Sequence, residues 1–121
     1  MNKDVFVNKI LKYNHDKVAC INANNETLTY RDLHQRVEQI EEFFSKNSQL
    51  RYKRYGLIIE DAFSLFPLVL GCLENIVSVP IDSDLPIEQI KQIMIDYRLS
   101  GLIYTNRQFE ECEGTLIQLD W

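Results

Sequence analysis

From residue 55 onward, short apolar runs alternate with segments in which apolar residues recur every three or four positions. The first pattern is typical of buried strands, and the second is typical of helices packed against a sheet. The sequence predicts strands over residues 55–60, 76–81, 102–105 and 115–119, and helices over residues 62–74 and 86–98. Strands that alternate with helices indicate an α/β fold with a mostly parallel sheet and flanking helices.

The first part of the chain has a different pattern. It predicts a helix over residues 1–16 and then a hairpin whose strands cover residues 18–22 and 27–30. The turn between them is Ala23-Asn24-Asn25-Glu26, because Asn tolerates left-handed backbone angles and bonds its own backbone. We therefore expect an N-terminal helix and a β-hairpin to precede the parallel sheet.

A helix is predicted to begin directly after Thr29, whose hydroxyl can cap it, with Asp32 near its positive end. This helix is expected to end near Asn47-Ser48. Its polar positions, among them Glu38 and Lys46, fall on the side opposite the apolar ones. The predicted core-facing stripe consists of Tyr30, Leu33, Val37, Ile40 and Phe44.

Several residues mark the ends of the later helices. Pro67 leaves two alternatives: the helix starts near Ser64, with Pro67 in its first turn, or the helix is kinked at Pro67. Asn75 suits the left-handed position that ends a helix. Asp84 is the expected cap of the next helix, with Pro86 in its first turn. The apolar stripe predicted for that helix is Ile90, Ile93, Met94 and Tyr97.

Composition narrows the class of protein. The chain has 121 residues, 45% apolar and 26% charged, which suits one domain with a real core. Its formal net charge of -5 argues against nucleic-acid binding, since phosphate contacts need a clustered positive surface. The basic residues Arg51, Lys53 and Arg54 are interpreted as part of a solvated loop. No apolar run reaches the roughly 18 residues of a membrane span, and we expect no membrane partner.

The cysteines point to a reducing compartment. Cys20, Cys72 and Cys112 are odd in number and far apart, so neither a disulfide framework nor a zinc site is indicated. Cys20 and Cys72 sit in apolar runs and are interpreted as small core residues. The N-terminus also lacks the apolar centre of a signal peptide. Together these features predict a cytoplasmic protein.

One acidic pair resembles the metal-binding acids of a known class of signalling domain. Glu60-Asp61 follows an apolar strand, as does the Mg²⁺-binding acid pair of phosphorylatable receiver domains. A receiver also needs an aspartate at the end of a later strand, and strand 102–105 ends in Thr105-Asn106 instead. We therefore interpret the pair as acids at the start of a helix.

Other polar groups carry weaker signals. Asp82-Ser83-Asp84 offers two carboxylates without a third ligand nearby, which favours a capping role over a cation site. His15 and His34 lie on polar segments without partners at metal-ligand spacing, and each is interpreted as a solvated surface residue. The acidic run at residues 110–113 is interpreted as a solvated loop. No serine lies in the turn that a nucleophile requires.

Three segments resemble motifs of adenylate-forming (AMP-binding) enzymes. Leu28-Thr29-Tyr30-Arg31-Asp32-Leu33 resembles the first core motif of adenylation domains. Val79-Pro80-Ile81-Asp82 resembles the end of their second core motif, and Leu85-Pro86-Ile87-Glu88-Gln89-Ile90 resembles the pattern that follows it. Order and spacing also match, so the resemblance covers residues 18–105. The Val-Pro-Ile-Asp sequence resembles the amino-acid-activating domains of nonribosomal peptide synthetases more than it resembles acyl-CoA ligases.

The resemblance implies a reaction in which a carboxylate is joined to the α-phosphate of ATP with Mg²⁺. The family carries this chemistry on a Gly/Ser/Thr-rich phosphate loop ending in lysine, a ribose-binding acid and a lysine in a C-terminal lid, all downstream of the matched region. The glycines here are far apart in the sequence: Gly56, Gly71, Gly101 and Gly114. We therefore expect no catalytic, cofactor-binding or metal-binding residue in this chain, and ATP and Mg²⁺ only in the complete enzyme.

The chain also departs from the family's pattern. Leu73 stands where the family usually has lysine, and Asn75 where it has glycine. Arg98-Leu99 replaces a serine-glycine pair. These changes indicate a divergent member, or one that is no longer held to the family's pattern.

Three functions remain open. The chain, residues 1–121, is expected to be one incomplete domain that forms the N-terminal scaffold of an adenylate-forming ligase. Its partner would then be the rest of an adenylation domain. Alternatively, it is a standalone, non-catalytic module that docks on a synthetase or complements a split domain. An unrelated flavodoxin-like binding domain ranks last. Uncovered sheet edges and helix faces predict a partner, self-association or poor solubility.

Overall fold

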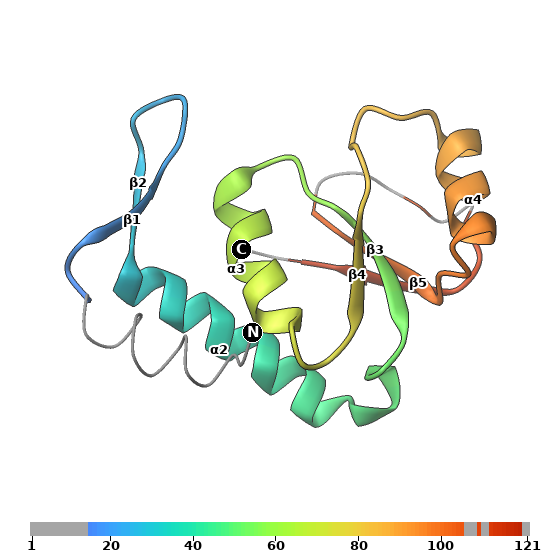
Figure 1. The fold of residues 1–121 in the computed structure, drawn as a ribbon, viewed down its shortest axis with the longest axis horizontal. Coiled ribbons are helices and arrows are strands. Elements are labelled where there is room, and N and C mark those ends of the chain that lie inside the picture. The colour runs from blue at the N-terminus through green and yellow to red at the C-terminus, as the bar shows by residue number, and fades with distance from the viewer. Residues whose placement is uncertain (1–14, 106–108, 110–111, 120–121) are drawn as a thin grey trace.

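The computed structural model describes residues 15–105, 109 and 112–119 (Figure 1). The helix predicted over residues 1–16 lies outside these residues except for His15 and Asp16, which form a turn. A parallel sheet forms the centre of the described part. Helices α2 and α3 lie on one side of it and α4 lies on the other (Figure 1). The predicted α/β class with a hairpin before a parallel sheet is confirmed.

The hairpin consists of β1 (Val18–Ile21) and β2 (Thr27–Thr29), which pair antiparallel. Asn25 has a φ of 61°, the left-handed angle that was expected of an Asn in this turn. The side-chain Oδ1 of Asn22 accepts hydrogen bonds from the N–H groups of Asn24 and Glu26, both at 3.0 Å. The turn is therefore satisfied by Asn22, which the sequence assigned to the preceding strand, and not by the side chains of Asn24 and Asn25 as expected.

The parallel sheet has four strands in the order β4-β3-β5-β6. Pro80 ends β4, which pairs only with β3 among the described strands, so its missing N–H donor costs no ladder bond there. Arg54 lies within β3, so the prediction that the whole basic cluster belongs to a loop is wrong. The strands are β3 (Arg54–Ile58), β4 (Val77–Pro80), β5 (Gly101–Tyr104) and β6 (Thr115–Gln118).

Helix α2 (Tyr30–Lys46) begins where the sequence predicted. The Thr29 hydroxyl accepts from the Asp32 N–H at 3.2 Å, and the Asp32 carboxylate accepts from the Thr29 N–H at 3.5 Å. This reciprocal pair is a capping box, which satisfies two otherwise unpaired donors. A short 3₁₀ helix, η2 (Ser48–Leu50), follows. Tyr30, the first residue of the predicted stripe, is half-buried. The other four residues are buried, as predicted: Leu33, Val37, Ile40 and Phe44.

Helix α3 (Ala62–Cys72) starts earlier than one alternative required. Its cap is Asp61, which accepts from the Phe63 N–H at 3.1 Å, so a start near Ser64 is wrong and Pro67 lies in the second turn. A proline there cannot donate to the carbonyl four residues earlier, which is that of Phe63. The Arg36 guanidinium on α2 donates to this carbonyl at 2.8 Å. An arginine on the neighbouring helix thus satisfies the group that Pro67 leaves unpaired.

Asn75 ends this region by a different route from the predicted one. It is not among the described non-glycine residues with positive φ, so the prediction of a left-handed position is wrong. Instead its buried side chain donates from Nδ2 to the carbonyl of Gly71 at 3.0 Å. The side chain thereby satisfies a helix-end carbonyl that a left-handed turn would otherwise have served.

Helix α4 (Ile87–Asp96) is shorter than predicted. Pro86 occupies its N-cap position without a side-chain bond, so the prediction of Asp84 as the cap is wrong. The Asp84 N–H donates to the Asp82 carboxylate at 2.9 Å in a turn before the helix. Tyr97 lies beyond the last helical residue and is 57% exposed, so its place in the apolar stripe is also wrong. Ile90 is fully buried as predicted.

Gly71 sets the distance between α2 and α3. A Cβ at this position would lie 2.6 Å from the Cβ of Ile40, closer than real Cβ contacts. Because that atom belongs to the base of a side chain, it cannot swing away. The two helices therefore pack closely only with glycine at residue 71.

We expect the Arg36 bond and Pro67 to be energetically coupled. Arg36→Leu should lower the free energy of unfolding by about 1–3 kcal/mol, since it leaves the Phe63 carbonyl unpaired. In a Pro67→Ala background the restored N–H can serve that carbonyl, so the same change should cost less. Urea denaturation of the four proteins measures this double-mutant cycle. Equal costs in both backgrounds would contradict the proposed compensation.

We also expect Gly71→Ala to destabilise the fold. Overpacking against Ile40 costs about 1–3 kcal/mol, which exceeds the roughly 1 kcal/mol that alanine gains over glycine inside a helix. Urea denaturation measures the change, and Ser45→Ala on the exposed side of α2 is the matched control. A midpoint for Gly71→Ala at or above the wild-type value would show that the helices separate at no cost.

Candidate functional site

Ligands of parallel α/β sheets bind beyond the carboxyl ends of the strands, where neighbouring strands connect to opposite sides. Here that point lies between β3 and β5, since the chain leaves β3 for one edge and returns to β5. Glu60 and Asp61 follow β3, Asp82 follows β4 and Thr105 follows β5. The Thr105 carbonyl accepts from the Gln118 side chain at 3.0 Å. This edge therefore carries acids and a threonine.

The acid pair at this edge is engaged by the helix that follows it. Asp61 caps α3, with the Phe63 N–H at 3.1 Å and the Ser64 hydroxyl at 3.5 Å from its carboxylate oxygens. Both Glu60 and Asp61 are exposed. The interpretation of this pair as a helix start is confirmed for Asp61. A receiver-type acceptor aspartate does not end β5, whose last residue is Tyr104.

No metal centre forms among the residues that the structure describes. Within them, no group of three or more His, Cys, Asp or Glu side chains is placed to hold an ion. Asp82 accepts from the Asp84 N–H and thereby closes a turn. The Asp82-Ser83-Asp84 segment thus has a local structural role, although not the capping role that was predicted.

The two histidines are not independent surface residues, and that prediction is wrong. The His15 and His34 rings stack with centroids 6.5 Å apart. The His34 Nε2 also lies 3.3 Å from the Glu38 carboxylate one turn further along α2. The Arg31 N–H donates to the His15 carbonyl, which brings the start of the hairpin onto the start of α2. Their separation in the sequence hid this contact.

The glycines are placed by packing. Gly56 and Gly71 lie inside β3 and α3. Gly101 and Gly114 come together at the amino ends of β5 and β6, where added Cβ atoms would meet backbone of Thr115 at 1.9 Å and of Ser100 at 2.6 Å. This edge is opposite to the one where α/β sheets bind ligands.

The basic residues make internal contacts. Arg54 donates to the Tyr97 carbonyl at 3.2 Å, which ties β3 to the end of α4. The guanidinium of the half-buried Arg51 lies 4.9 Å from the centre of the Tyr52 ring. Lys53 is exposed. Arg54 is exposed as well, so two of the three basic residues reach the solvent.

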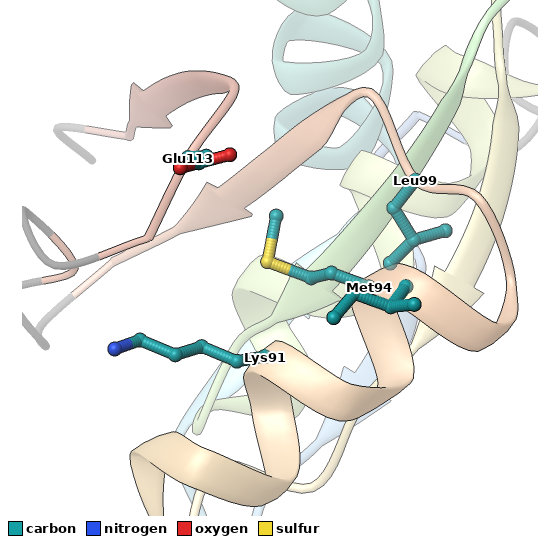
Figure 2. Close-up of a pocket in the computed structure, with 5 residues that line it drawn as sticks. Lys91, Met94, Leu99 and Glu113 are labelled. Atoms are coloured by element: carbon teal, nitrogen blue, oxygen red, sulfur yellow. The ribbon is translucent and has the colours of Figure 1, made fainter.

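A cleft of about 400 Å³ opens beside α4, lined by Lys91, Met94, Ile95, Leu99 and Glu113. Figure 2 shows Lys91 and Met94 projecting from α4, with Glu113 on the segment that leads into β6. The walls combine one amine, one carboxylate and apolar side chains. Leu99 and Glu113 precede β5 and β6, so this part of the cleft lies toward the amino edge of the sheet. The cleft could not be read from the sequence, because it forms between a helix and a distant loop.

Cys72 is the cysteine whose ionisation the fold changes most clearly. Burial raises the pKa of its thiol from 9.0 to about 12, although a hydrogen bond with Ser78 acts in the opposite direction. Burial also raises the pKa of Cys20, which is half-buried. The interpretation of Cys72 as a core residue is confirmed. The thiolate is the nucleophile, so the folded chain keeps Cys72 unreactive.

We expect iodoacetamide to spare Cys72 in the folded chain at pH 8 and to alkylate it in urea, as measured by peptide mass spectrometry. The unfolded thiol ionises near pH 9 and the folded one near 12, so the unfolded state holds fewer protons between these values. Cys72 should therefore lower the stability as the pH rises through this window. Alkylation at equal rates in buffer and urea would contradict its burial.

Comparisons with known proteins now place the chain. The sequence model of the AMP-binding enzyme family matches residues 7–120, nearly the whole chain. The chain therefore belongs to the AMP-binding enzyme family, and the resemblance drawn from the motifs is confirmed. A comparison with curated proteins finds no match. Among the described residues, no helix is long and apolar enough to cross a membrane.

Solved structures share the fold. The Klebsiella oxytoca NpsA N-terminal subdomain, in complex with 3-hydroxybenzoyl-AMSN, matches with a TM-score of 0.80 and 20% identity over 96% of this chain and 29% of that one. The four-domain nonribosomal peptide synthetase AB3403, bound to AMP and glycine, matches with a TM-score of 0.78 and 21% identity, over 99% of this chain and 9% of that one. A benzoate CoA ligase from Burkholderia xenovorans LB400 matches with a TM-score of 0.72 and 18% identity, over 88% of this chain and 22% of that one. The chain spans less than a third of each.

Proposed function

We propose that this chain is the N-terminal scaffold of an adenylate-forming ligase and is not catalytic by itself. The observation that carries the proposal is the family match over residues 7–120, combined with the small share of each related structure that the chain spans. In this role the chain supplies a parallel sheet and its helices to a larger domain. Residues 1–121 would then form one incomplete domain, in which residues 18–105 resemble the N-terminal domain of adenylate-forming enzymes.

ATP and Mg²⁺ belong, in this proposal, to the complete enzyme. The chain's own glycines fit a nucleotide poorly, since Gly56 and Gly71 pack inside β3 and α3 and the space beside Gly101 and Gly114 holds backbone atoms. Asp61, the acid at the sheet's carboxyl edge, is engaged as a helix cap. These placements support the expectation of no catalytic, cofactor-binding or metal residue.

The proposed substrate of the complete enzyme is an amino acid. The Val79-Pro80-Ile81-Asp82 segment supports this choice through its resemblance to amino-acid-activating domains. Among the structural relatives, AB3403 was solved with AMP and glycine, whereas other relatives carry aryl groups or are named for benzoate. The three cysteines are free, which supports a reducing cytoplasm as the compartment.

The second candidate is a standalone module that docks on a synthetase. It is favoured by positions where the chain departs from the family. Arg98, part of the segment that replaces serine-glycine, has a φ of 54°, an angle that favours glycine. Leu73, where the family usually has lysine, is 41% exposed. Such changes are expected of a chain released from the constraints of an enzyme.

We expect the purified chain to catalyse no exchange of labelled pyrophosphate into ATP with any of the twenty amino acids or with benzoate, because the chain supplies no phosphate loop. A complete adenylate-forming ligase assayed in parallel is the control. Exchange that stays with the chain through a second purification step would contradict the proposal.

Light scattering with a thermal melt separates the two candidates. Aggregation or a broad melt, relieved by a complementary fragment, fits a scaffold. A monodisperse monomer with a sharp melt fits the standalone module.

A further inference from the structure

Helix α3 differs from the other described helices in having no polar side. Ser64 is its only residue with a polar side chain, and no charged residue lies within Ala62–Cys72. Helices α2 and α4 both carry charged residues on an exposed side, such as Glu42 on α2 and Glu88 on α4. A helix that is apolar all round is one that is covered all round in the folded protein.

Two sides of α3 are covered in this structure. Phe63 and Leu70 of α3 pack against Leu33 and Val37 of α2. Leu68 and Cys72 are fully buried, in the cluster that also holds apolar residues of β3 and β5. These contacts account for the two sides of the helix that face α2 and the sheet.

The third side is covered only in part, because Val69 packs partly against the cluster over the sheet. Phe66, Val69 and Leu73 recur at three- and four-residue steps and form what we call the α3 stripe. Phe66 is 39% exposed, Leu73 is 41% exposed and Val69 is half-buried. In Figure 1, α3 and the edge strand β4 lie near each other on the side facing the viewer.

Exposed apolar residues continue from the stripe to the start of β4. Val77, the first residue of that strand, is 56% exposed, and Tyr52 is 75% exposed. The Tyr52 N–H donates to the Asn75 carbonyl at 2.6 Å, and the Val77 N–H donates to the Lys53 carbonyl at 2.9 Å. These bonds hold Tyr52 beside the segment that joins α3 to β4. Such an exposed apolar surface marks an interaction site.

We propose that the α3 stripe is the surface on which the remaining part of an adenylation subdomain packs. This inference rests on the scaffold function proposed above. The NpsA N-terminal subdomain has the same fold over this region, yet the chain covers only 29% of it. Most of such a subdomain is thus available to cover α3. Leu73 is the C-cap of α3 and lies at one end of the stripe, so we place it at the rim of the surface, where interfaces tolerate polar side chains.

The test is co-expression of the tagged chain with the NpsA N-terminal subdomain lacking the stretch that this chain matches. The two pieces are expected to copurify in equal amounts. Phe66→Asp should lower the copurified amount about tenfold or more, because it puts a charge at an aromatic side chain that the complex would bury. Leu73→Lys, at the rim, should keep it within about twofold.

Ile95→Asp is the matched control, since Ile95 is 70% exposed on α4, on the opposite side of the sheet. It should leave copurification unchanged. Phe66→Leu keeps an apolar side chain at this position and should retain the binding that Phe66→Asp loses. Far-ultraviolet circular dichroism and a thermal melt of each variant report whether it folds.

The outcomes separate the two proposals. If the wild-type chain does not copurify, the inference fails, whereas the scaffold function is judged separately by the light scattering and thermal melt described above. If it copurifies and folded Phe66→Asp binds equally well, only the α3 stripe is overturned. Light scattering can also show that the chain forms a dimer through Phe66 and that this dimer excludes the fragment. The α3 stripe would then bind a second copy of the chain, and the inference would be overturned.

Discussion

The close contact of α2 with α3 is the constraint on which the rest of this structure depends. It exists because Gly71 presents no side chain to Ile40. At that distance Ile40 and Phe44 join the cluster over β3, so a helix that precedes the sheet becomes part of its core. Arg36 adds a polar bond across the same contact. The contact also fixes the rotation of α3, and so decides which of its apolar residues remain on the outside.

Features that depend on neighbours in the chain could be predicted from the sequence. The Thr29–Asp32 capping box joins residues three apart, and the strands and helices from residue 54 onward follow apolar runs of the expected kind. Two of the errors came from backbone groups that can be satisfied in more than one way. Asn75 uses its side chain on the Gly71 carbonyl instead of a left-handed turn. Similarly, the carbonyl that Pro67 leaves unpaired in α3 is satisfied by an arginine on another helix.

The candidate site was less predictable because its contacts are long-range. The stacking of His15 on His34 requires the hairpin to fold back on α2, and the cleft beside Lys91 requires a loop that precedes β6. Neither leaves a local signal. The helix-start role of Asp61 could be predicted, because it needs only the residues that follow it. The family motifs could also be recognised locally. Thr29 and Asp32 cap the helix that begins beside them, and Pro80 ends the strand that contains it.

The meeting of β5 and β6 has a consequence for variation in the chain between them. Thr115 donates its N–H to the Ser100 carbonyl, and its own carbonyl occupies the space that a side chain at Gly101 would need. The alignment of the two strands is therefore set at their amino ends, independently of how the connection reaches β6. Loop closure entropy grows slowly with length, but Phe109 and Cys112 in this connection are buried in the same cluster as Tyr104, so a change of length is tolerated where these two residues keep their places. Evolution can thus alter this connection while β6 keeps its place in the sheet.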